Sequence, residues 1–88
     1  MVQFLVHNKV EDYKNWKPFF DEHASFRAKH GSKSAKVFRC KEDANDVLIF
    51  FEWDSLENAQ KFMESDELKK TMKEAGVIGK PNIYFVEK

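Results

Sequence analysis

The order of hydrophobic and polar positions predicts alternating strands and helices along the chain. Four short segments have the apolar or alternating pattern of β-strands, at residues 2–9, 34–40, 47–53 and 83–86. From Asp12 to His30 the apolar residues instead recur three or four positions apart, which indicates an amphipathic helix. A second stretch with helical spacing, residues 56–75, follows the third strand.

Side chains typical of helix termini divide the helical stretches further. Gly31 provides a left-handed position for the end of the first helix, and Pro18 predicts that this helix restarts in its first half. Asp54 or Ser55 is placed to cap the second helical stretch, because a short side-chain oxygen accepts from the free amides of a first turn. Ser65 or Asp66 predicts a new cap within that stretch.

The connecting segments complete a β-α-β-β-α-β order. Residues 41–46 are polar and predict a hairpin turn, whereas residues 77–81 predict a loop before the last strand. Because crossover connections are right-handed, this order favours the α+β, ferredoxin-like arrangement. That arrangement is a four-stranded antiparallel sheet with both helical stretches on one face. We expect residues 1–88 to form a single domain of this kind.

The third strand predicts a second layer over the other face of the sheet. Its alternating sets are both largely apolar: Val47, Ile49, Phe51 and Trp53 on one side, and Leu48, Phe50 and Glu52 on the other. An antiparallel sheet that faces water on one side normally alternates apolar with polar residues. Two helical stretches cover one face only, so we expect a homodimer in which two sheets pack face to face.

Composition narrows the class of protein. Fifteen Lys and Arg residues balance fifteen Asp and Glu residues, so the chain lacks the positive charge typical of nucleic-acid-binding proteins. Cys40 is the single cysteine, which argues against a disulfide-stabilised secreted domain. The apolar run near the N-terminus is too short for a signal peptide or a membrane span. We expect a cytoplasmic protein that binds neither nucleic acid nor membrane.

Several segments resemble one family across nearly the whole chain. Residues 10–13 with Trp16, residues 20–23, residues 51–59 and residues 79–85 are similar to the dimeric α+β barrel proteins, the antibiotic-biosynthesis-monooxygenase-like superfamily. The resemblance implies a dimeric α+β barrel. It does not select an activity, because the superfamily includes cofactor-free quinone-forming monooxygenases, haem-degrading oxygenases, polyketide cyclases and lactone isomerases.

The haem-degrading branch matches poorly. The resemblance implies an Asn at the end of the first strand, a position held here by Asn8, with a Trp and a His on the second helix. The corresponding helix positions hold Phe62 and Met72, which leaves no imidazole there for the iron. We therefore expect neither haem nor another cofactor. No metal site is expected either, because the three histidines lack metal-ligand spacing.

His7 and Glu52 are the candidate catalytic residues. His7 lies near the end of the first strand, and an imidazole can serve as a general base near neutral pH. The alternative is a histidine hydrogen-bonded at the barrel rim. Glu52 is the sole acid of the apolar third strand and a candidate for proton transfer, or else an ion-pair partner of Arg39. His23, within the apolar stripe of the first helix, is more typical of a core histidine.

The candidate ligand-binding residues are Asn8, Phe38, Phe51, Trp53 and Tyr84. The four aromatic side chains would form the wall of a pocket for a flat molecule, although aromatic residues in a small protein also simply fill the core. We expect the pocket near the ends of the first and third strands, where His7 or Asn8 converges with Glu52 or Trp53.

The leading hypothesis is therefore a dimeric barrel that binds a small planar organic molecule, with monooxygenase-like or isomerase-like turnover. The alternative is a non-catalytic dimerisation or ligand-sensing module with a solid interior. The two differ in whether each protomer holds a cavity of roughly 300 Å³ or more beside His7, Asn8 or Glu52. The sequence does not identify the substrate or establish catalysis.

Overall fold

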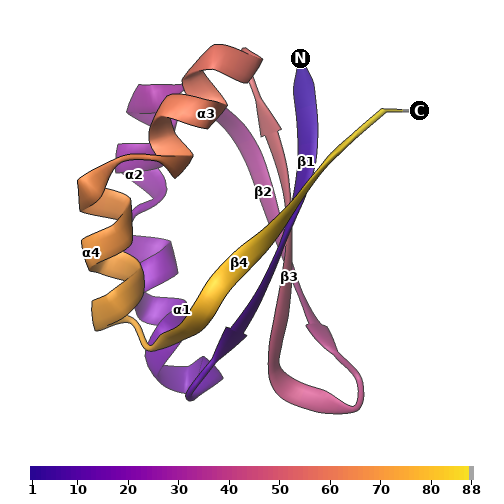
Figure 1. Cartoon of the computed structure of the whole chain (residues 1–88), viewed down its shortest axis with the longest axis vertical. Coiled ribbons are helices and arrows are strands. Elements are labelled where there is room, and N and C mark those ends of the chain that lie inside the picture. Colours follow the sequence, from indigo (N-terminus) through magenta and orange to yellow (C-terminus); the bar gives the residue numbers. More distant parts are fainter. Residues whose placement is uncertain (88) are drawn as a thin grey trace.

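A computed structural model describes residues 1–87, which form one antiparallel sheet with helices on one of its faces (Figure 1). The elements in chain order are β1 (Val2–Val10), α1 (Tyr13–Glu22), α2 (Ala24–His30), β2 (Ser32–Cys40), β3 (Asp43–Trp53), α3 (Leu56–Met63), α4 (Asp66–Glu74) and β4 (Val77–Val86). No helix in this part of the chain is long and apolar enough to cross a membrane.

The strand order is β2-β3-β1-β4, and every neighbouring pair is antiparallel. The first and third strands are therefore the central ones, and β2 and β4 form the edges. This is the ferredoxin-like topology, so the fold class predicted from the hydrophobic pattern is confirmed.

The last strand begins earlier than the sequence indicated. Residues 77–81, predicted as a loop, belong to β4. Pro81 is tolerated because an edge strand has one side without a hydrogen-bonded neighbour. Between His7 and Lys9, β1 advances two residues, while β4 covers four residues from Asn82 back to Ile78. The two extra residues form a bulge, in which Gly79 has a φ of 71°.

The first helical stretch divides at His23 and not at Pro18. Pro18 lies inside α1, and His23 is both the last cap of α1 and the first cap of α2. The guanidinium of Arg27 donates to the backbone carbonyl of Phe20 at 2.8 Å, which gives this carbonyl near the end of α1 a partner outside the regular helix pattern. The predicted end at Gly31 is confirmed, with a φ of 123°.

Short polar side chains cap the helices much as predicted. The hydroxyl of Ser55 accepts from the amide of Asn58 at 3.1 Å, and the hydroxyl of Ser65 accepts from the amide of Leu68 at 3.2 Å. These two caps separate α3 from α4 within the second helical stretch.

The hydrophobic core lies between the sheet and the helices. Its largest fully buried side chains include Phe4 and Trp53, and Val47, Ile49 and Phe51 extend it along β3. The ring of Phe4 lies 5.3 Å from that of Phe51 and 6.4 Å from that of Trp53, measured between centroids. The helix-facing set of β3 is thus the one that begins with Val47.

The opposite face of the sheet is also apolar and is uncovered in the single chain. Leu5 pairs with Phe50 on one side and Tyr84 on the other, and Leu48 pairs with Phe38. Phe38 and Tyr84 remain 54% and 55% exposed. The two-faced apolar pattern predicted for the third strand is therefore present, and the dimer that it implies stays a prediction.

Removal of the Phe4 ring should destabilise the fold strongly. Because Phe4 is fully buried, Phe4→Ala should lower the free energy of unfolding by about 3–5 kcal/mol through lost burial and a residual cavity. Leu56→Ala, at a position 45% exposed on α3, is the control and should have a much smaller effect. Urea denaturation followed by circular dichroism measures both. Equal midpoints for the two variants would contradict the core described above.

Candidate ligand-binding cavity

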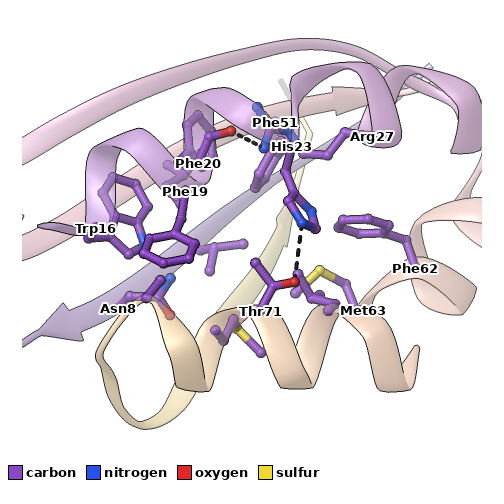
Figure 2. Close-up of a pocket in the computed structure, with 15 residues that line it drawn as sticks. Asn8, Trp16, Phe19, Phe20, His23, Arg27, Phe51, Phe62, Met63 and Thr71 are labelled. Atoms are coloured by element: carbon purple, nitrogen blue, oxygen red, sulfur yellow. Dashed lines mark hydrogen bonds between the residues drawn. The ribbon is translucent and has the colours of Figure 1, made fainter.

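A cavity of about 60 Å³ lies between the helix-facing side of the sheet and the helices (Figure 2). Aromatic side chains make up much of its lining: Trp16, Phe19, Phe20, Phe51 and Phe62. Four polar or charged side chains also reach it: Asn8, His23, Arg27 and Thr71. The cavity is therefore an apolar chamber with few polar groups, which is the general character of small-molecule sites.

Asn8 contributes a buried amide from the end of β1. It is only 5% exposed, and its Oδ1 has no hydrogen-bond partner within residues 1–87. The neighbouring helix-facing residues of the strand, Val6 and Val10, are apolar and buried. A buried amide oxygen without a partner is costly, on the order of 1–3 kcal/mol. Asn8 is thus an acceptor available to a hydroxyl or amine in the cavity.

His23 contributes an imidazole from the junction of α1 and α2. Its Nε2 and the hydroxyl of Thr71 on α4 are hydrogen-bonded at 3.1 Å, as the dashed line in Figure 2 shows. The ring also packs against Phe26, with 5.3 Å between centroids. These contacts fix the orientation of the ring at the wall of the cavity. When Nε2 carries the proton and donates to Thr71, the lone pair of Nδ1 is free to act as a base toward a bound molecule.

Arg27 is buried, with 7% exposure, and lies beside His23. Its guanidinium carbon sits 3.8 Å from the centroid of the Phe20 ring, in a cation–π arrangement. Burial lowers the pKa of Arg27, and the charge of Asp21 partly opposes this effect. Because Arg27 also donates to the Phe20 carbonyl, its main role in this structure is to hold the junction of α1 and α2.

The cavity is smaller than a preformed site for an organic ligand. Its volume of about 60 Å³ holds a few water molecules, whereas such sites commonly measure roughly 300–1,000 Å³. Part of its wall consists of Met63 and Met72. Methionine side chains are unbranched and adapt their shape readily. A planar ligand therefore needs lining side chains to move, and these two methionines are the most adaptable among them.

Neither His7 nor Glu52 lines this cavity, in contrast to the predicted convergence. Both lie on the uncovered face of the sheet, because strand alternation directs His7 away from Asn8. His7 pairs with Asp46, and Glu52 accepts from Gln3 at 3.3 Å. In the register of β1 with β3, His7 is opposite Leu48, which lies four residues along β3 from Glu52.

The predicted ligand-binding residues divide among three places. Asn8 and Phe51 line the cavity. Trp53 is fully buried in the core and packs against Phe62, with 5.0 Å between ring centroids. Phe38 and Tyr84 lie on the uncovered face of the sheet. Of the four aromatic residues expected to form the wall, only Phe51 lines the cavity, and the other aromatic lining residues come from the helices.

Sequence reasoning missed the contribution of Thr71 and Arg27 to the cavity. Thr71 is one polar residue of the mainly charged α4, and nothing in its spacing distinguishes it. A signal for Asn8 was present, since it is the polar member of the apolar alternating set Phe4, Val6, Asn8 and Val10. Within residues 1–87, no three His, Cys, Asp or Glu side chains gather where they could hold a metal ion.

Comparison with known proteins supports the fold. No protein-family model matches the sequence, and no curated protein matches it. Among solved structures, a proposed antibiotic biosynthesis monooxygenase from Bordetella bronchiseptica aligns with a TM-score of 0.81 at 13% identity, covering 99% of this chain and 95% of that one.

Two further structures agree. A proposed antibiotic biosynthesis monooxygenase from Caulobacter crescentus aligns with a TM-score of 0.77 at 15% identity, covering 99% of this chain and 88% of that one. SnoaB, a cofactor-independent oxygenase from Streptomyces nogalater, aligns with a TM-score of 0.75 at 13% identity, covering 99% and 93% of the two chains. The chain therefore has the fold of the antibiotic-biosynthesis-monooxygenase-like proteins, as the resemblance in its sequence predicted.

Proposed function

We propose that this chain binds a small planar organic molecule in the cavity between sheet and helices and oxidises it with molecular oxygen, without a cofactor. The observation that carries the proposal is the unpartnered Oδ1 of Asn8 in a chamber lined by aromatic rings. A phenolic or enolic hydroxyl would donate to this oxygen while its ring system packs against Phe51 and Trp16. The same fold supports a cofactor-independent oxygenase in SnoaB.

His23 is the group proposed to start the reaction. Oxidation by oxygen without a cofactor needs an electron-rich carbanion or enolate, which forms when a base removes a proton from the substrate. The imidazole of His23 lines the cavity and is oriented by Thr71. With an anthrone as substrate, the enolate reacts with dioxygen to give the quinone and water. An isomerase-like reaction would use the same base and consume no oxygen.

A non-catalytic ligand-binding module is the second candidate. The small volume of the cavity, about 60 Å³, favours it, because a space of this size leaves little room for an organic substrate and dioxygen to react together. The two functions make different use of His23: an oxygenase requires its imidazole as a base, whereas a binding module requires only its shape and its hydrogen bond to Thr71.

We also propose a homodimer formed through the uncovered face of the sheet. Leu48, Phe38 and Tyr84 expose apolar surface there, and Leu5 and Phe50 lie between them on the central strands. Contiguous apolar surface of this kind is rare on soluble monomers and is typical of interfaces. A second copy presents the same surface, so each sheet would cover the other.

Replacement of Asn8 by leucine should stabilise the fold and abolish ligand binding in the cavity. Leucine has a similar volume and no polar atom, so Asn8→Leu should increase the free energy of unfolding by about 1 kcal/mol. The same variant should lose the rise in melting temperature that fused-ring phenols give to the wild type. Asn15→Leu, at an exposed position of α1, is the control. A destabilised Asn8→Leu protein that still binds would contradict the role given to Asn8.

The variant His23→Gln tests catalysis separately from binding. Glutamine can keep a hydrogen bond to Thr71 but is not a base, so oxygen consumption with an anthrone should fall by about 10²–10⁴-fold while binding persists. His30→Gln is the matched control, because His30 lies outside the cavity lining and bonds to the carbonyl of Phe26 at 2.8 Å. His7→Ala should retain turnover. Full activity in His23→Gln, with activity lost in His7→Ala, would restore His7 as the base.

Sedimentation equilibrium tests the dimer. The wild type should sediment as a dimer at micromolar concentration, with a shared area above roughly 1,000 Å². Leu48→Lys places a charge in the centre of the uncovered face and should give monomers, whereas Leu56→Lys, on the outer surface of α3, should leave the dimer intact. A monomeric wild type would refute the proposed interface.

A further inference from the structure

A groove separate from the cavity runs between α4 and the first half of β4. Its volume is about 490 Å³, which is within the range of small-molecule sites. Its floor is apolar and includes Val77, Pro81 and Ile83. Figure 1 shows α4 joined to the beginning of β4 by a short connection.

The groove and the cavity share a wall. Met63 and Met72 line both spaces, and the two spaces share no other lining residue within residues 1–87. Each is half-buried. Because methionine adapts its conformation at little cost, movement of this pair would join the groove to the cavity and to Asn8. The groove thus offers the volume that the cavity lacks.

Three lysines line the groove together with its apolar residues. Lys69 and Lys73 come from α4, and Lys80 comes from the bulge of β4, so both walls contribute positive charge. Within residues 1–87, no carboxylate forms an ion pair with any of the three. Lys69 and Lys73 are four residues apart on one helix, where like charges repel each other.

The acidic residues of α4 face elsewhere. Asp66, Glu67 and Glu74 line a different depression, on the other side of the helix. The chain as a whole has equal numbers of acidic and basic residues, so the positive charge at the groove arises from the arrangement of residues and not from composition. An apolar floor beneath unneutralised cations is complementary to a molecule with an apolar body and an anionic group.

We infer that this groove is the access route and anion subsite for the ligand, and that the ligand is a planar molecule bearing a carboxylate or similar anionic group. Lys69, Lys73 and Lys80 hold the anionic group, and the ring system passes between Met63 and Met72 toward the cavity. This inference deepens the proposed function and rests on it for the reaction, but the anion subsite itself can be measured without turnover.

Two fluorescent probes that differ only in charge provide the test. Anilinonaphthalene sulfonate carries an anionic group, and phenylnaphthylamine has the same rings without it. The variant Lys69→Gln/Lys73→Gln/Lys80→Gln should weaken binding of the sulfonate by about tenfold or more and leave the neutral probe unchanged. Raising the ionic strength from about 0.05 to 0.5 M should weaken only the sulfonate. The matched control is Lys14→Gln/Lys29→Gln/Lys41→Gln, which removes the same charge from exposed positions outside the groove.

Three results would overturn the inference: no binding of the sulfonate to the wild type, equal loss of both probes in the groove variant, or equal weakening in the control variant. Its failure is distinguishable from failure of the proposed function. Charge-dependent binding in the groove with no oxidation of any anthrone would refute only the oxygenase. Oxidation that depends on His23, with unchanged sulfonate binding in the groove variant, would refute only the anion subsite.

Discussion

The structure depends on two central strands whose side chains are apolar on both faces of the sheet. The helices cover one face and enclose the core around Phe4 and Trp53, while Leu48 and Phe50 on the other face have no cover within the chain. Hydrophobic burial is roughly proportional to the apolar area removed from water, so the exposed apolar surface of this second face adds little to the stability of a single chain. The position of the candidate site follows from the same division, because only the helix-covered face can enclose a cavity.

The cavity lies where the sheet and the helices leave space beside a few polar or charged side chains. The junction at His23 turns the chain between α1 and α2, and Arg27 stabilises that turn through the carbonyl of Phe20. Together with the buried amide of Asn8, these residues reduce the stability that an entirely apolar interior would provide. Polar groups retained in an aromatic chamber are typical of a site selected for binding as well as for folding.

The sequence predicted the fold well because hydrophobic period and helix caps act locally. The alternation in β3 and the caps at Ser55 and Ser65 can be read from neighbouring residues alone. The site was harder to predict, because it depends on which face of β1 meets the helices, and both sets of β3 are apolar enough to do so. His7 and Asn8 point to opposite faces in either case, so this choice decides which of the two reaches the cavity. The hydrogen bond between His23 and Thr71 joins residues 48 positions apart in the sequence, a separation that no local pattern encodes.

The bulge in β4 affects which insertions and deletions this fold can accept during evolution. Its two extra residues sit in an edge strand, whose far side has no neighbouring strand to disturb, although the positive φ of Gly79 favours glycine at that position. Insertions or deletions here would alter the width of the space beside α4 without shifting the register of β1 against β3. The fold therefore combines a framework of two central strands with an edge segment of adjustable length, so ligand preference can change through segment length as well as by substitution.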